Sequence, residues 1–296
     1  MRNPDEFRAA ARELGVSDAS LTLILKHLRP AYALSVGDGS AGWLGGYPEL
    51  PAGMPWDGEQ VLVAAVDLAA LPEHSLDTGL PGEGRLLLFA EEYMDRFATL
   101  DDYDGSTTLP YTLYIPPGTE TVAWDSSSGG EFFVLDRRPL QAETVWDLPE
   151  DMHLDNFFRD PADMDAEERE MYEEAVALDA AVEEFRSLAG HLAPLDLADS
   201  YYVKLCGVAH PQQESVETAV VDRLEERKEV GAIGPYPDAY ESGFVTREEQ
   251  EAAWKPLAEA GQNGLFHEGD GVLYWMVPGV DLALGRFDRT EVVYQC

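Results

Sequence analysis

The residues with the clearest potential for chemistry lie in one short loop after an apolar run. His210 and Gln213 follow the stretch YYVKLC, and an imidazole and an amide in a loop are the kind of polar groups that orient a small ligand. Trp56 and Trp275 are aromatic candidates for the walls of the same pocket. Tryptophan more often packs in a core and a lone loop histidine is commonly surface, so a purely structural role for these residues stays open.

Signatures of known catalytic and metal sites are missing. The six histidines form no H-x-H or H-E-x-x-H pair, and Cys206 and Cys296 lack metal-ligand spacing, so we expect no metal and no cofactor. Residues 37–42 fit G-x-G-x-x-G, but the proline-rich sequence that follows cannot begin the helix that a dinucleotide site needs. With 57 acidic residues, no pair can be singled out for acid–base work. The sequence identifies no catalytic residue and favours a protein that is not an enzyme.

The charge balance limits the partners. The formal net charge is −37, from 57 acidic and 20 basic residues. Phosphate backbones and anionic lipids repel such a chain, so we expect it to bind neither nucleic acid nor membranes. A basic protein is the partner that this charge would attract. Two alternatives are that the charge only maintains solubility, and that the carboxylates imitate the phosphates of a nucleic acid.

The first residues and the hydropathy indicate a compartment. The sequence begins MRNPDEFRAAARELG, which is amphipathic and has no apolar core of the kind that a secretory signal carries. No run approaches the length of a membrane span. The expected location is the cytoplasm.

The periodicity predicts an α+β fold with largely antiparallel sheets. Apolar spacing predicts helices over 3–15 and 18–28, which form an N-terminal helical hairpin. Six runs between residues 31 and 148 have strand patterning and are separated by Gly- and Pro-rich turns. These runs are AYALSV, VLVAAVDL, RLLLFA, YTLYIP, TVAW and EFFVLD.

In the second part of the chain the sequence predicts helices between the strands. Residues 149–164 read as an acidic connector and 165–189 as a long acidic helix. A strand in YYVKLCGVAH, a helix over 216–229, and a short helix from the Thr246–Glu249 capping box to about Trp254 follow. GVLYWMVP and TEVVYQC read as closing strands. We predict that residues 1–30 form a hairpin packed on a body, and that 31–296 form a single domain with the 149–190 segment between two sheet-rich halves.

Two segments resemble each other weakly. VLVAAVDL followed by GRLLLF has the same layout as WKPLAEA followed by GVLYWM. The similarity fits a duplication that gave two related halves, and a chance likeness of two hairpins explains it equally well.

Three stretches resemble the YwqG-like family of uncharacterised bacterial proteins. The first runs from Gly42 to Trp56, the second is KLCGVAHPQQES, and the third is Gly271–Cys296. The positions that carry the first signature loop are Gly45, Gly46, Pro48 and Pro51. The three stretches occur in the family's order and span most of the chain.

The resemblance implies an α+β fold with large antiparallel sheets and two related halves. It names no catalytic residue or ligand, and it hints at an immunity-like or scaffold role through protein binding. A small-ligand protein or an enzyme with a pocket between the sheets is the alternative. One departure is that Ala65 stands where the family has a glutamine, and Glu259 or a neighbour replaces the matching glutamine of the second half.

Overall fold

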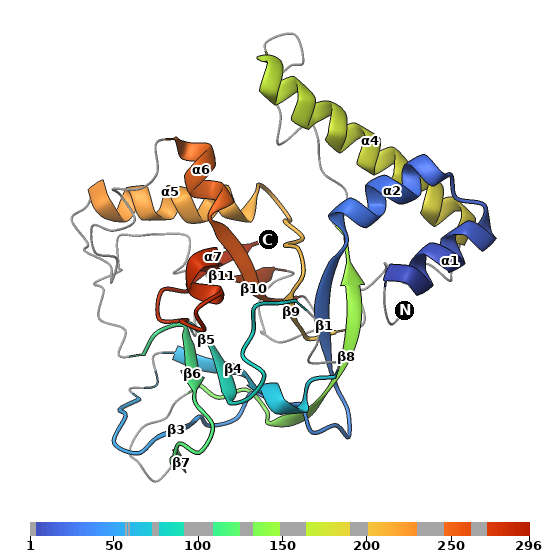
Figure 1. Ribbon diagram of the computed structural model, residues 1–296. Coiled ribbons are helices and arrows are strands. Elements are labelled where there is room, and N and C mark those ends of the chain that lie inside the picture. Colours follow the sequence, from blue (N-terminus) through green and yellow to red (C-terminus); the bar gives the residue numbers. More distant parts are fainter. Residues whose placement is uncertain are drawn as a thin grey trace.

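The protein is built on one large antiparallel sheet, seen in a computed structural model (Figure 1). The model describes residues 4–56, 58, 60–72, 77–91, 109–124, 133–148, 164–189, 201–229, 246–261 and 271–296. Ten strands form the sheet in the order β12-β11-β10-β9-β1-β8-β2-β4-β5-β6, and β3 with β7 forms a separate two-stranded ribbon. The predicted α+β fold with largely antiparallel sheets is confirmed.

The strands of the large sheet have these bounds: β1 (Arg29–Val36), β2 (Gly42–Leu44), β4 (Gln60–Asp67), β5 (Arg85–Glu91), β6 (Thr112–Ile115), β8 (Arg138–Asp147), β9 (Val203–Cys206), β10 (Trp254–Ala260), β11 (Val272–Pro278) and β12 (Glu291–Gln295). The ribbon consists of β3 (Glu49–Pro51) and β7 (Thr121–Ala123).

Six helices occur among the described residues, together with a 3₁₀ turn. They are α1 (Pro4–Leu14), α2 (Asp18–His27), α4 (Ala166–Ala189), α5 (Val216–Glu229), α6 (Arg247–Ala252) and α7 (Gly279–Leu282), and the 3₁₀ turn is Leu68–Ala70. The predicted capping box forms, because the Thr246 and Glu249 side chains each accept a hydrogen bond from the other's backbone N–H. The helix that follows stops at Ala252 rather than near Trp254, which begins β10.

The predicted N-terminal hairpin is present and packs against α4. Phe7 of α1 and Phe185 of α4 are buried, with ring centroids 5.1 Å apart. In α2, the N-cap Ser17 donates its backbone N–H to Glu184 at 3.0 Å, and at the other end His27 Nε2 lies 2.7 Å from Glu174. A carboxylate thus faces the positive end of α2, which is the favourable side of the helix dipole. That this helix is an acidic one stays a prediction, as does the division of the chain at residue 30.

One strand assignment was wrong. EFFVLD was predicted to form a strand, but the described part of it, residues 133–136, has no regular structure. The strand follows it instead, because β8 runs from Arg138 to Asp147 and pairs along its length with β1. The acidic connector at 149–163 lies outside the described residues.

The sheet curls so that its two ends share one core. That core contains side chains of β4 and β5 together with side chains of β10 and β11. Trp275 of β11 reaches across it and donates its indole N–H to the Phe89 carbonyl of β5 at 2.9 Å. The outer face of β4 and β5 is covered by the β3–β7 ribbon, and the outer face of β10 and β11 is covered by α5.

The two ends of the sheet repeat one pattern. β4 pairs with β5 through a bulge after Leu62, and β10 pairs with β11 through a bulge after Pro256. When the two hairpins are aligned at these bulges, Ala65 of the first corresponds to Glu259 of the second. The neighbouring positions that then correspond, Val63 with Leu257, Ala64 with Ala258 and Val66 with Ala260, all belong to the shared core.

The neighbouring strands extend the correspondence. Trp43 of β2 pairs with Ala65, and Lys204 of β9 pairs with Glu259. The turns that follow have matching backbones, because the φ angles of Gly45 and Gly46 are 61° and 80°, and those of Cys206 and Gly207 are 61° and 81°. A non-glycine residue at such an angle is uncommon, so the match at Cys206 is specific. These registers support two related halves.

The halves have exchanged their central strands. β1 precedes β2 in the chain but pairs with β8 and β9, while β8 precedes β9 but pairs with β1 and β2. Ala33 of β1 pairs with Lys204, and Pro139 of β8 pairs with Trp43, the residue that corresponds to Lys204. With the same offset Ser35 corresponds to Gln141, and these two residues pair with each other, which places the symmetry axis of the two halves between them.

None of the helices in the described ranges is both long enough and apolar enough to cross a membrane.

Candidate functional site

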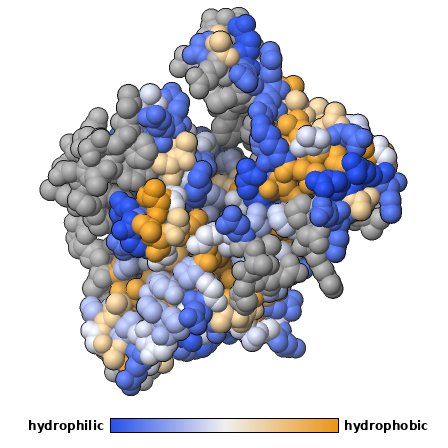
Figure 2. Space-filling model, in the orientation of Figure 1, coloured by the Kyte–Doolittle hydropathy of each residue, from blue (hydrophilic) through white to orange (hydrophobic). Residues whose placement is uncertain are grey.

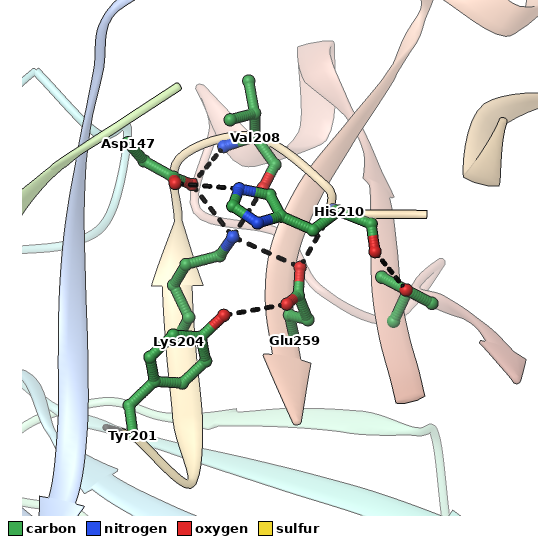
Figure 3. Close-up of polar contacts among 7 residues, drawn as sticks. Asp147, Tyr201, Lys204, Val208, His210 and Glu259 are labelled. Carbon is green, nitrogen blue, oxygen red and sulfur yellow. Dashed lines mark hydrogen bonds and ion pairs between the residues drawn. The ribbon is translucent and has the colours of Figure 1, made fainter. Parts of the chain in front are cut away.

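A network of buried ionisable side chains is supplied by β9, by its neighbour β10, and by the end of β8, which lies on the other side of β1 (Figure 3). Lys204 is at its centre, and no part of the residue is exposed. The ammonium Nζ lies 2.9 Å from Asp147 Oδ2 and 3.2 Å from Glu259 Oε2, and it donates to the Val208 carbonyl at 2.7 Å. Each of the three N–H donors of the ammonium therefore has an acceptor.

Two of the partners also hold the loop that follows β9. Asp147 accepts the Val208 backbone N–H at 2.9 Å, and its second oxygen lies 2.9 Å from His210 Nε2. Glu259 accepts the His210 backbone N–H at 3.1 Å. The loop is pinned through both its backbone and its histidine.

Two tyrosines complete the network. Tyr201 donates its hydroxyl to Glu259 Oε1 at 2.9 Å, and Tyr274 donates its hydroxyl to the His210 carbonyl at 2.5 Å. Burial raises the pKa of the Tyr274 phenol far above its ordinary value, and the Glu259 charge adds to the rise. Tyr274 therefore stays a hydrogen-bond donor over the whole physiological range.

The charges in the network stabilise one another. Burial alone would raise the pKa of Asp147, but the Lys204 ammonium and the hydrogen bonds from His210 and Val208 outweigh it, and that pKa lies below its ordinary value. Burial alone would lower the pKa of Lys204, but the Glu259 and Asp147 carboxylates outweigh it and raise that pKa. Both groups are ionised at neutral pH.

The network is closed rather than open to a substrate. Lys204 fills its donors with protein acceptors, so it has no free N–H for a ligand. Within the ranges that the structure covers, no three His, Cys, Asp or Glu side chains are arranged to hold a metal ion. Nearby Cys206 is buried, and burial raises the pKa of its thiol to about 12, so it is not a nucleophile near neutral pH. The arrangement anchors the loop at residues 207–210 and shows no group poised for catalysis.

The equivalent place in the first half holds different chemistry. Trp43 corresponds to Lys204, and the guanidinium groups of Arg85 and Arg137 lie over its ring, 4.7 and 4.1 Å from the centroid. Glu49 binds both arginines, Arg85 at 2.9 Å and Arg137 at 3.0 Å. This cluster is partly open, since half of the Arg137 side chain is exposed.

The structure does not bring the four predicted binding residues into one pocket. His210 belongs to the buried network, while Gln213 is exposed and donates its side-chain amide to the Cys296 carbonyl at 2.7 Å. Trp275 lies in the central core and Trp56 lies in the separate cluster beneath the ribbon. Because the four residues do not line one cavity, a shared ligand-binding role for them stays a hypothesis.

The signature loop does have a defined structural task. Gly45 donates its N–H to the Val63 carbonyl at 2.9 Å, and a side chain there would collide with the backbone of Asp136. Pro48 is buried and its carbonyl accepts the Trp124 N–H, and Pro51 closes β3. The glycines, Gly46 included, let the loop turn with positive φ beside β8.

The sequence reasoning missed Lys204, Asp147 and Glu259 as a group. One signal was present: a single lysine between Val203 and Leu205 in an apolar strand requires a buried counter-charge. Which carboxylates supply it depends on long-range pairing.

A family described as Domain of unknown function (DUF1963) matches residues 43–296. No curated protein matches the chain.

Proposed function

Because the chain belongs to this family, whose function is unknown, we propose a function from the site: the protein is an acidic scaffold that binds a basic protein. The observation that carries the proposal is that the buried ionisable network is turned inward and saturated by protein partners. Contact with a partner is then made by surface residues, and the chain that carries them has a net charge of −37. Charge of one sign speeds association with a partner of the opposite sign and makes binding depend on salt. We also propose that the family relationship is the YwqG-like one, on the signature loops quoted above.

The test is a binding measurement across ionic strength. Tagged protein is incubated with native lysate in 50 mM salt, a recovered protein is purified, and the binary complex is reconstituted. We expect a partner with a basic surface and an affinity that falls steeply between about 50 and 500 mM NaCl, as screening predicts. Recovery of no partner at low salt, or a complex insensitive to salt, contradicts the proposal.

A second candidate, binding of a small apolar ligand, has one observation in its favour. A surface cavity of about 190 Å³ is lined by Leu50, Met54 and Trp124 among others. Trp124 packs edge-on against Trp56, with ring centroids 5.5 Å apart. Typical ligand pockets measure about 300–1,000 Å³, so this cavity suits only a small occupant and ranks below the protein-binding role.

A further inference from the structure

Trp43 and its two arginines combine features that the closed network lacks. Arg85 begins β5 and Arg137 immediately precedes β8, yet both place a guanidinium over the one indole ring. Their side chains are 28% and 50% exposed, whereas that of Lys204 is 1% exposed. The same position in the two halves is thus sealed in one and reachable from solvent in the other.

The cluster has spare hydrogen-bond donors. Glu49 accepts one bond from each arginine, through Oε2 and Oε1 respectively. Each guanidinium has five N–H groups, so most of them are not used by Glu49. The indole Nε1 of Trp43 is buried and has no hydrogen-bond partner among the described residues. Buried donors without acceptors are rare in folded proteins and point to a missing acceptor.

The local charge has the sign that an acceptor would require. Two guanidinium groups against one carboxylate leave a net charge of +1, in a chain whose net charge is −37. Contact with the indole and with Glu49 restrains both guanidinium groups, which lowers the entropy cost of binding a planar or tetrahedral oxyanion. We propose that Trp43, Arg85 and Arg137 bind a small oxyanion, the phosphate or carboxylate group of a low-molecular-weight compound. This site is independent of the protein-binding role above.

A purely structural role makes a different prediction. If the arginines only clamp Glu49, and with it the β3–β7 ribbon, then added anions leave the indole N–H undisturbed. A ligand site instead requires saturable binding that depends on the partly exposed Arg137.

The test follows the indole N–H of Trp43 by NMR in protein labelled with ¹⁵N-tryptophan. The probes are inorganic phosphate and, separately, citrate, each titrated at constant ionic strength set with NaCl. The Trp43 signal is assigned by its loss in Trp43→Phe. We expect a saturable shift of this signal, and an affinity at least about tenfold weaker in Arg137→Gln, because a charge-assisted bond is lost. Arg137→Lys should recover part of the affinity, and Arg8→Gln, on the exposed face of α1, should match wild type.

Each result decides the matter. Saturation by phosphate alone or by citrate alone supports the site and assigns its preferred group. No saturable shift with either probe overturns the proposal, and so does an equal affinity in wild type and Arg137→Gln while the Arg137→Gln spectrum shows a folded protein.

Discussion

Lys204 decides whether the buried polar network stabilises or destabilises the folded protein. It is one of four lysines in the chain and it has no exposed surface. Two carboxylates share its charge, and without it both would stay buried without the ammonium that neutralises them. Breaking a buried ion pair costs far more than the pair contributes in net stability.

We predict that Lys204→Met destabilises the protein by about 3–5 kcal/mol, because Asp147 and Glu259 lose their counter-charge. Urea unfolding followed by circular dichroism measures the change. Lys255→Met is the matched control, since Lys255 is an exposed lysine on β10 and should change stability by about 0.5 kcal/mol or less. A loss of similar size in both variants would show that the buried pairing is not responsible.

The same pair predicts a pH dependence. The pKa of Asp147 is lowered, so its contribution to stability is complete above the unfolded value of about 3.9 and is lost as pH falls through the folded pKa. The pKa of Lys204 is raised, so its contribution is complete below about 10.4 and is lost as pH rises through the folded pKa. The difference in unfolding free energy between wild type and Lys204→Met should therefore be largest between these limits and shrink in acid. A difference that stays constant from pH 7 to 3 contradicts this.

At the scale of elements, glycines fix where the loops of the two halves turn. Gly207 has φ of 81°, and a Cβ there would lie 2.3 Å from Asp147 Oδ2. Gly53 has φ of 83°, but a Cβ there would meet nothing within 4 Å. Comparing substitutions at the two positions therefore separates the cost of a strained backbone from the cost of a steric clash.

We predict that Gly207→Ala is much more destabilising than Gly53→Ala. Both pay the left-handed backbone cost of about 1–2 kcal/mol, but only Gly207→Ala displaces Asp147 from the buried network. Thermal and urea unfolding of the two variants compares them directly. Equal losses would mean that the loop moves away and the network tolerates it.

The helical unit carries a second element-scale prediction. Phe7→Ala removes a ring that is 1% exposed and packed against Phe185, so we expect a loss of about 3–5 kcal/mol. In Phe7→Ala, amide hydrogen exchange should become faster in α2 and α4 and change less in the sheet. Val176→Ala, at an exposed position of α4, is the control and should leave exchange unchanged. Unchanged protection of α4 in Phe7→Ala would mean that the hairpin does not support it.

Local patterns predicted most elements, and failures have physical causes. Helices with apolar stripes, such as α1 and α2, follow from the sequence because their signals are local. β8 was missed because it opens with Arg138 and Pro139 and has few large apolar residues, although it lies between β1 and β2. Asp147, at its end, lies just before the predicted acidic connector at 149–164 and carried no local signal of its own. Its role depends on Lys204, which is 57 positions away in the sequence but adjacent in space.

At the scale of the whole molecule, the net charge of −37 acts against compactness. We predict that raising NaCl from 20 to 500 mM increases the melting temperature by a few degrees, because it screens repulsion among exposed carboxylates. Differential scanning calorimetry provides the measurement. The cost of Lys204→Met should change little over the same range, since that network is buried. A melting temperature that falls with salt would show that net attraction, not repulsion, dominates the surface.

The exchange of β1 and β8 also sets what happens if the polypeptide is severed between residues 124 and 133. Each fragment would still carry the strand that completes the other's sheet, so the pieces would interlock instead of separating. We therefore expect this protein to tolerate a nick, or expression from two genes, better than two independent modules would. Neither piece, taken alone, has a complete sheet on which to fold.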